Sequence, residues 1–343
     1  MRQIFVNGRY AAHARTGMQY YAQELVSRFQ GRARTIAPVS PLKGAKGHMW
    51  EQFVLPLRAR GGLLWSPNNT GPIASFRQIC TIHDLIPLDY PQWFQPDFAR
   101  WYGWLLPRLA RKSAHLIAVS HYTKARAVEL LGVSAGKISV VHNGVDKRFA
   151  PVSSAAIART KQELGIRFER YVLIVGSIEP RKNVAGFLRA WPEISRREPD
   201  LGLVIAGARG SGLVFGNAGL PEASANVCFT GYVRHELLPA LYAGAMALVY
   251  PTLAEGFGLP PLEAMACGTP VVTAMNSSLP EVVGDAATGV DPLDPASIAE
   301  AVVRLARSET LRNDYRTRGL RRAAQFSWDR CAAETWKVLE AFA

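Results

Sequence analysis

The chain has 343 residues, of which 48% are hydrophobic and 20% are charged. These values exclude a disordered or fibrous protein, and the length suggests two domains that each bury a core. No apolar stretch approaches the ~20 residues that a membrane-spanning helix needs. The first eight residues lead into a strand-like run without the apolar segment of a secretory signal, and the four cysteines lack metal-ligand spacing. We therefore expect a reduced, cytoplasmic protein with no metal and no other cofactor.

Positive charge is concentrated in the first half of the chain. Residues 1–165 carry 22 Lys and Arg against 8 Asp and Glu, whereas residues 166–343 carry 18 against 19. Such a one-sided distribution indicates an anionic partner that faces the first half. Nucleic acid, acidic lipid and diphosphate substrates are all compatible with it.

Short apolar runs alternate with longer amphipathic segments along the whole chain. Near-continuous apolar strands separated by helices are typical of parallel sheets that are covered on both faces. The expected strands lie at residues 3–6, 35–39, 63–66, 79–83, 116–120 and 138–142, and then at 171–175, 202–206, 227–231, 247–250 and 270–273.

The alternation restarts near residue 171, after a turn-rich, polar stretch at 143–154 that is typical of a linker. We therefore expect an α/β fold of two Rossmann-like domains, residues 1–165 and 166–325, that face each other across a cleft. Ligands of such sheets bind at the carboxyl ends of the strands.

Residues 251–270 form the segment that is richest in chemistry. Two prolines, Pro260 and Pro261, suit the first turn of a helix, and Gly256 and Gly258 allow a ligand to approach the backbone. The helix amino terminus and the loop amides together predict a site for an anion such as a diphosphate. The amides are those of Phe257, Gly258 and Leu259.

Two carboxylates flank this predicted anion site. Glu255 lies on the loop, and Glu263 lies in the first turns of the helix. A carboxylate that accepts two hydroxyl groups binds a vicinal diol, so one would hold a sugar ring and the other a ribose. Alternatively, Glu263 only complements the helix dipole and Glu255 is a solvated loop residue. The complete unit of strand, Glu, glycines, prolines and Glu favours the ligand-binding interpretation.

The run E-G-F-G-L-P-P-L-E-A-M-A-C-G-T-P-V-V at 255–272 resembles the E-x7-E signature of retaining glycosyltransferases of family 4, which have the GT-B fold. V-G-S-I-E-P-R-K-N at 175–183 resembles the donor-diphosphate loop of that family. The similarity covers nearly the full chain. The amino-terminal half matches at residues 81–88, 119–123 and 141–146, and its glycine loop is resembled by T-G-M-Q-Y-Y-A at 16–22. The resemblance implies a GT-B protein whose last helix, about 326–343, crosses back onto the first domain.

The resemblance also implies roles for individual residues. Glu255 would contact hydroxyl groups of the transferred sugar, and Glu263 would contact the nucleotide ribose. Arg181 and Lys182 would neutralise the diphosphate, and Gly17 would complete its cradle with backbone amides. The other donor-binding positions are Ser177, where some members carry an arginine, then Tyr232 and Val233 near the base, and Phe257, Gly258 and Leu259.

His83 matches the family histidine that lies at the donor sugar, beside the acceptor. An isolated histidine at a strand end is more often a structural hydrogen bonder, but the end of a central strand in a parallel sheet favours function. We expect His83, Glu255 and Lys182 to be the catalytic residues. Positive groups on the leaving diphosphate lower the barrier as the anomeric carbon becomes cationic, and without a metal Lys and Arg must supply them.

The donor and acceptor are less defined by sequence. E-P-R-K-N together with H-D-L-I-P resembles members that use GDP-mannose or related GDP-sugars in bacterial polysaccharide or lipopolysaccharide assembly, and a UDP-sugar is the alternative. Members of the family commonly extend glycans on lipid carriers. The acceptor would then be a glycan or a lipid-linked glycan.

Aromatic and basic side chains cluster at residues 93–112, which contain three Trp, one Arg-Trp pair, one Trp-Tyr pair and four Lys or Arg. Such residues are typical of a membrane–water interface, although they also pack helices onto sheets. An anionic membrane surface, reached from the cytoplasm through the basic half, is the predicted partner. A nucleic-acid-binding protein is the rival interpretation, but no helix-turn-helix, RNP or zinc pattern supports it.

Overall fold

The computed structural model describes residues 2–12, 17–29, 31–42, 44–75, 77–208, 214 and 226–343. It contains two compact units. The first comprises Met1–Pro91, Pro96–Gly144 and Phe326–Ala343, and the second comprises Gln92–Gln95 and Val145–Gln325. The predicted boundary at residue 165 is therefore too late. Helix α7 (Ser154–Glu163) belongs to the second unit because it packs against α9 (Leu238–Ala243) there.

Six parallel strands form the sheet of the first unit, in the order β2-β1-β3-β4-β5-β6. The side chains of the four inner strands are all buried, as the continuous apolar runs predict, whereas the edge strands β2 and β6 are partly exposed. The strands are β1 (Ile4–Asn7), β2 (Ala33–Ile36), β3 (Leu63–Ser66), β4 (Gln78–Ile82), β5 (His115–Ala118) and β6 (Ile138–Val140).

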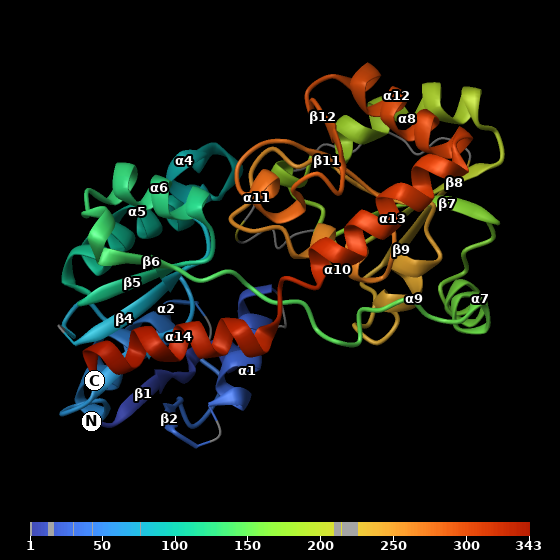
Figure 1. Cartoon of the computed structure of the whole chain (residues 1–343). Coiled ribbons are helices and arrows are strands. Elements are labelled where there is room, and N and C mark those ends of the chain that lie inside the picture. Colours follow the sequence, from blue (N-terminus) through green and yellow to red (C-terminus); the bar gives the residue numbers. More distant parts are fainter. Residues whose placement is uncertain are drawn as a thin grey trace. The chain divides into compact units, whose positions relative to one another are not determined.

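Helices cover this sheet on both faces (Figure 1). The core on one face joins Ile82 and Leu116 of the sheet to Leu106 and Leu109 of α5 and to Leu131 of α6. The helices are α1 (Gly17–Arg28), α2 (Gly44–Met49), α3 (Leu55–Arg58), α4 (Ile86–Asp89), α5 (Pro96–Lys112), α6 (His121–Leu131) and α14 (Trp328–Phe342), with one π-helical turn η2 (Trp50–Val54) and 3-10 turns η1 (Gly8–Ala12), η3 (Pro91–Trp93) and η4 (Ala135–Lys137).

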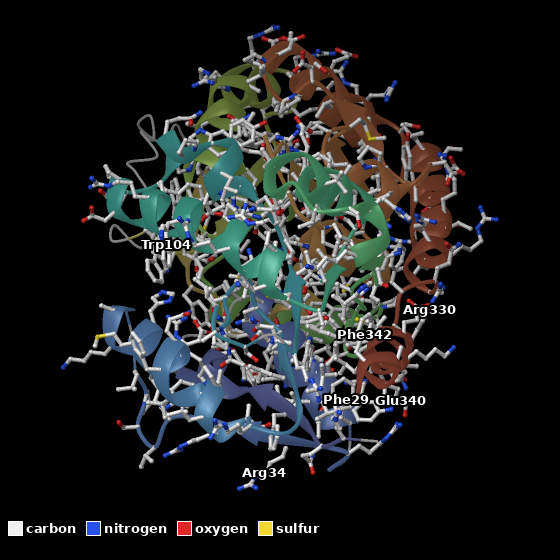
Figure 2. All side chains as sticks on the ribbon, turned by 90° about the vertical axis from the view of Figure 1, so that its left-hand side faces the viewer. Phe29, Arg34, Trp104, Arg330, Glu340 and Phe342 are labelled. Atoms are coloured by element: carbon white, nitrogen blue, oxygen red, sulfur yellow. The ribbon has the colours of Figure 1, made fainter. Side chains whose placement is uncertain are left out.

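The last helix, α14, belongs to the first unit and packs against α1, as Figure 1 shows. The ring of Phe29 lies 5.0 Å from that of Trp336, and Arg28 forms a 2.7 Å ion pair with Asp329; Phe29 is labelled beside this helix in Figure 2. Gly144 must be glycine, because a Cβ there would lie 2.1 Å from the backbone nitrogen of Trp328.

The second unit contains another six-stranded parallel sheet, in the order β12-β11-β10-β7-β8-β9. Every predicted strand is present in the two sheets within a few residues. The sequence prediction missed only β12, which has three residues and a central glycine and therefore lacks an apolar run. The strands are β7 (Arg170–Val175), β8 (Leu201–Ala206), β9 (Val227–Gly231), β10 (Ala247–Tyr250), β11 (Val271–Ala274) and β12 (Thr288–Val290).

The largest core of this unit lies between the sheet and two amphipathic helices, α8 and α12. Trp191 of α8 is fully buried there, as are Val302 and Leu305 of α12. The remaining elements are η5 (Pro180–Lys182), α8 (Val184–Arg197), α10 (Leu259–Ala266), α11 (Leu279–Val283), α12 (Pro295–Arg307) and α13 (Glu309–Ala323). Within the described residues, no helix is both long and apolar enough to cross a membrane.

The strand order reverses once in each sheet. In the first unit the chain leaves β1 for β2 on one side and then continues through β3 on the other, and in the second unit the same reversal separates β7 from β10. Ligands of open α/β sheets bind outside the carboxyl ends of the strands at such a point. The residues that follow β1, β3, β7 and β10 therefore lie where a ligand is expected to bind.

Candidate active site

The loop after β7 carries the cations of the predicted donor site. It begins at Gly176, whose φ of +136° is accessible to glycine and rarely to other residues. It then enters the short turn η5, which contains Arg181 and Lys182, and ends at Asn183 in the left-handed conformation. A Cβ on Gly176 would contact the Lys182 side chain at 3.5 Å, so the glycine leaves room for this lysine beside the end of the strand.

The loop after β10 is fastened to the loop after β7. The Thr252 hydroxyl and the Leu253 amide both donate to the carbonyl of Arg181 at 2.8 Å, and the Asn183 amide group donates to the Pro251 carbonyl at 3.1 Å. The Glu255 amide in turn donates to the Ser277 hydroxyl at 3.0 Å. These hydrogen bonds, each of which has a backbone group as donor or acceptor, thus fix the position of Glu255 relative to Arg181 and Lys182.

Glu255 is the centre of a buried charged cluster. Its Oε1 atom lies 2.6 Å from Lys182 Nζ and 2.7 Å from Arg181 Nη1. The same oxygen accepts a hydrogen bond from the Tyr250 hydroxyl at 2.8 Å, and the Thr252 hydroxyl, which donates to the Arg181 carbonyl, lies 3.2 Å from it. Glu255 and Lys182 are only 7% and 8% exposed. Three residues predicted from sequence to serve the donor therefore meet at one carboxylate oxygen.

The electrostatics keep this carboxylate ionised. Burial by itself would raise the pKa of Glu255, but Arg181 and Lys182 outweigh it and lower that pKa to about 2. Arg181 is shared, since its Nε also lies 2.5 Å from Glu179 Oε1. Two cations are thus held next to each other at the carboxyl end of the sheet by two carboxylates.

Glu263, the second carboxylate of the E-x7-E unit, lies on helix α10, where the charge of Lys182 still acts on it. Its Oε2 atom accepts a hydrogen bond from the Tyr242 hydroxyl at 2.8 Å. Burial and the charge of Asp146 raise the pKa of Glu263 to about 7, although the Tyr242 hydrogen bond opposes the shift. The two glutamates therefore have different protonation behaviour near neutral pH.

The glycine loop between the two glutamates has the expected shape. Gly258 has φ of +108° and directly precedes α10, which begins at Leu259 with prolines in its first turn. Phe257 is buried, and its carbonyl accepts a hydrogen bond from the Ser278 hydroxyl at 2.8 Å. Because Pro260 and Pro261 have no amide hydrogen, the amides available at this helix terminus come from the glycine loop and Leu259.

The remaining predicted donor residues occupy different settings. Ser177 is exposed in the loop after β7. Tyr232 is exposed and Val233 is buried, directly after β9 ends at Gly231. Gly17 is exposed at the start of α1 in the first unit, while Thr16 before it lies outside the described residues.

His83 follows β4 in the first unit and is buried. Its Nε2 lies 2.7 Å from the Pro67 carbonyl oxygen, and its ring meets the edge of Tyr21 at 4.8 Å. Burial lowers the pKa of His83 to about 4, against the effect of the Pro67 hydrogen bond, so the imidazole is neutral at neutral pH. A carbonyl oxygen only accepts, so Nε2 carries the proton and Nδ1 is left as an acceptor.

Sequence reasoning missed three hydroxyl-bearing residues of the second unit: Tyr250, Thr252 and Tyr242. Tyr250 also accepts a hydrogen bond from Lys182 Nζ, so its phenol contacts both the lysine and Glu255, which contact each other as well. Tyr250 ends a buried strand and Tyr242 lies in a helix, where each appears in the sequence as an ordinary core aromatic. The position of Tyr250 at the carboxyl end of a strand was the one available signal.

A second buried charged cluster lies at the reversal point of the first sheet, and it too was missed. Glu51 of η2 is fully buried and pairs with Arg9 at 3.0 Å. Its other oxygen accepts from the Asn7 amide group at 2.7 Å and from the Thr70 hydroxyl at 2.9 Å. Asn7 ends β1 and also reaches Ser66 at the end of β3.

Comparison with known proteins identifies the family. The family description "Glycosyl transferases group 1" matches residues 157–322, and "Glycosyltransferase Family 4" matches residues 68–149. The Escherichia coli O-antigen chain mannosyltransferase B is 33% identical over 275 residues, which cover 78% of this chain and 71% of that protein. The chain belongs to glycosyltransferase family 4. This confirms the family resemblance and the prediction of a sugar-transferring enzyme.

Other relatives share parts of this glycosyltransferase. The Salmonella typhimurium O-antigen chain mannosyltransferase RfbU is 30% identical over 70% of this chain and 64% of its own. The serotype-specific mannosyltransferase WbdA of Escherichia coli is 28% identical over 74% of this chain but is much longer, since the match covers 32% of it.

Solved structures confirm the GT-B fold of the glycosyltransferase. Anabaena HepE, in complex with UDP and glucose, superposes with a TM-score of 0.78 at 18% identity and covers 99% of this chain and 100% of its own. WaaG, a glycosyltransferase involved in lipopolysaccharide biosynthesis, gives a TM-score of 0.72 at 17% identity, with 98% and 99% covered. At such identities these structures speak to the fold alone.

Proposed function

We propose that this glycosyltransferase moves a mannosyl or similar hexosyl group from a GDP-linked donor to a glycan or lipid-linked acceptor, with retention of configuration and without a metal. The observation that carries the proposal is the pair of cations, Arg181 and Lys182, held against Glu255 at the point where the sheet reverses. The relatives named as O-antigen mannosyltransferases support mannose and polysaccharide assembly.

The cluster suits the departure of a diphosphate. As the bond to the anomeric carbon breaks, negative charge grows on the leaving oxygen, and Arg181 and Lys182 are already placed to stabilise it. They are the positive groups on which the expectation of metal-independent transfer rests. Turnover that persists in EDTA would support this part of the proposal, and strong inhibition would contradict it.

Glu255 is suited to bind the sugar. The side chains that the structure describes on this carboxylate all contact Oε1, so Oε2 is the oxygen that would accept sugar hydroxyl groups. Glu263 would accept the two hydroxyl groups of the ribose, and Tyr232 and Val233 would border the base. The neutral imidazole of His83 would accept a hydroxyl proton through Nδ1 rather than act as a cation.

Retention follows if the acceptor attacks the face from which the diphosphate leaves. The leaving phosphate oxygen would then take the acceptor hydroxyl proton, so no separate base is needed. Proton NMR of the product, recorded before the anomers equilibrate, tests this: an α-configured donor gives an α-linkage. A β-linked product would contradict the retaining assignment.

The donor base is tested by calorimetric titration with GDP and with UDP. Both should bind, because both keep the ribose and diphosphate contacts, and GDP should bind more tightly. UDP binding that is tighter by tenfold, about 1.4 kcal/mol, would overturn the GDP assignment and leave the diphosphate site intact. The structure of HepE with UDP is the observation that keeps UDP as the alternative.

We also propose that the enzyme acts at the cytoplasmic face of an anionic membrane, where a lipid-linked acceptor would be presented. The excess of Lys and Arg in residues 1–165 supports this placement. Sedimentation with anionic vesicles tests it independently of donor binding.

A further inference from the structure

An exposed apolar stripe runs along the segment α2–η2–α3 of the first unit. Met49, Phe53 and Leu57 are 61%, 70% and 68% exposed, although each is a large hydrophobic residue. Isolated exposed apolar side chains are common, but three in register on one helical face are not explained by folding.

The π-helical turn η2 keeps these three side chains in line. Residues four apart drift around an ordinary α-helix, which has 3.6 residues per turn. In η2 the amide of Leu55 bonds to the carbonyl of Trp50, five residues back, so the turn holds one extra residue. The opposite face is anchored, since Trp50, Glu51 and Leu55 are buried and Glu51 pairs with Arg9.

Helix α5 extends the stripe with an indole. His48, next to Met49, lies 4.9 Å from the ring of Trp101, and Trp101 stacks on Trp104 at 5.2 Å. Trp104 is 43% exposed, and Figure 2 shows its side chain at the surface of the molecule. Of the aromatic cluster predicted between residues 93 and 112, Phe94 is buried in packing, whereas Trp104 reaches solvent.

Basic side chains surround this apolar surface. Arg108 lies over the Trp104 ring at 4.8 Å. The one acidic residue of α5, Asp97, is paired with Arg100, and the one acidic residue of α2–η2–α3, Glu51, is buried. The other exposed charges on or next to these two segments are all positive: Lys46, Arg58, Arg60, Arg111 and Lys112.

We propose that the surface formed by Met49, Phe53, Leu57 and Trp104 inserts into the headgroup region of an anionic lipid bilayer. Apolar side chains enter the boundary between headgroups and acyl chains, an indole suits that interface, and surrounding Lys and Arg attract anionic headgroups. A second copy of the chain does not fit, because an isologous contact through this face would place like charges against each other.

Vesicle sedimentation tests the stripe. The double variant Phe53→Ser with Leu57→Ser is expected to weaken binding to phosphatidylglycerol-containing vesicles by at least about tenfold. The matched control is Leu293→Ser, which removes a side chain of the same kind and exposure (73%) from the second unit and should bind like the wild type. Since all three positions are exposed, the thermal unfolding of every variant should match that of the wild type.

The basic rim and the depth of insertion are tested separately. Each of Lys46→Gln and Arg58→Gln should lower binding to anionic vesicles by about fivefold, and wild-type binding should be much weaker to phosphatidylcholine alone. A bimane label on Phe53→Cys should shift to the blue on anionic vesicles, whereas a label on Leu293→Cys should not.

Three outcomes would overturn the proposal: a wild-type enzyme that ignores anionic vesicles, a double variant that binds them as the wild type does, or a Phe53→Cys label that stays in water. If the wild-type enzyme did not bind anionic vesicles, a protein partner would be the remaining explanation of this exposed surface. The inference rests on the proposed membrane contact: a wild type that ignores anionic vesicles overturns both, whereas a double variant that binds like the wild type overturns only the assignment to this surface. The titrations with GDP and UDP examine the donor site without lipid, so the donor assignment is tested separately.

Discussion

The two sheets place the same chemistry at the same position and surround it differently. At each reversal point a buried carboxylate pairs with a cation from the loop after the unit's first strand: Glu51 with Arg9, and Glu255 with Lys182. In the first unit both carboxylate oxygens are taken, one by Arg9 and the other by Asn7 and Thr70. Such a saturated pair is typical of a structural element.

The cluster of the second unit differs from that of the first in having a carboxylate oxygen without a partner among the described residues and in its number of cations. The described donors converge on one oxygen of Glu255, and there are two cations, Arg181 and Lys182. Glycines with positive φ lie next to it, at Gly176 and Gly258, where they leave the backbone accessible. In the first unit Gly47 lets the chain close over the ion pair instead of leaving it accessible. A Cβ there would lie only 2.9 Å from Arg9 Nε. The two buried ion pairs thus differ in whether nearby glycines leave the backbone accessible and in whether both carboxylate oxygens already have partners in the described part of the chain.

The largest expected effect is on stability, in the first unit. Arg9→Met leaves Glu51 buried without its guanidinium partner and with the His48 imidazole, 3.7 Å away, as the remaining described partner of that oxygen. This loss should lower the free energy of unfolding by about 3–5 kcal/mol. Urea denaturation of the whole protein, with hydrogen exchange at the strands of the first unit as the readout, measures this change in the free energy of unfolding. Arg34→Met is the control: Arg34 is exposed on β2, as Figure 2 shows, so its loss should cost no more than about 0.5 kcal/mol. Equal unfolding curves for the two variants would refute a structural role of the Arg9–Glu51 pair.

The next effect is on turnover, in the second unit. Lys182→Ala should lower kcat by at least about 100-fold, because the proposed contact to the leaving diphosphate would be lost. Its cost in stability should be smaller than that of Arg9→Met, since Arg181, Tyr250 and Thr252 continue to hold Glu255. Steady-state kinetics and thermal unfolding of the same preparation measure both quantities. A Lys182→Ala enzyme with a lowered unfolding temperature but a normal kcat would show that this ion pair, like that of the first unit, is structural.

Tyr250→Phe sharpens the comparison by removing one donor from Glu255 and leaving both cations in place. The phenol keeps its proton, because burial and the nearby Glu255 carboxylate raise the pKa of Tyr250 well above its usual value. Its loss should lower kcat by roughly tenfold, the scale of one hydrogen bond to a charged group, with little change in the Kd of GDP. Thr252→Val gives a second variant of the same carboxylate. If Tyr250→Phe weakened GDP binding instead, the tyrosine would belong to the diphosphate site.

Most of the fold could be predicted from sequence because its strands are continuous apolar runs. The strand that escaped prediction, β12, is short, half polar and at the sheet edge. That Arg181, Lys182 and Glu255 lie together could be predicted because these residues lie in two short segments, each next to a predicted strand. Glu51 could not, because it lies 42 residues from Arg9 on a helical segment whose burial depends on packing. The role of Tyr250 could not be predicted either. A tyrosine at the end of a buried strand has the sequence pattern of a core residue, and only the structure shows the partners of its hydroxyl group.

The smallest expected effect separates the two carboxylates of the E-x7-E unit by pH. With a pKa near 2, Glu255 is ionised at every working pH, whereas Glu263, with a pKa of about 7, changes charge between pH 6 and pH 8. Because its pKa in the folded protein lies above the usual value, Glu263 favours the fold when protonated, and this contribution is lost as the pH rises toward 7. Donor binding should run the other way, since only the carboxylate accepts both ribose hydroxyl groups.

The Kd of GDP should therefore fall by a few-fold, at most about tenfold, between pH 6 and pH 8, and level off above that. Ionisation of the nucleotide's own phosphate contributes to the same range, so the matched control is Glu263→Gln, which keeps the shape and cannot titrate. Calorimetry at four pH values on both proteins isolates the difference between the two slopes, which belongs to Glu263 alone. Parallel slopes would show that Glu263 does not bind the ribose. A steeper wild-type slope would support donor binding through the Glu263 carboxylate, in contrast to Glu51 of the first unit, whose two oxygens are already occupied.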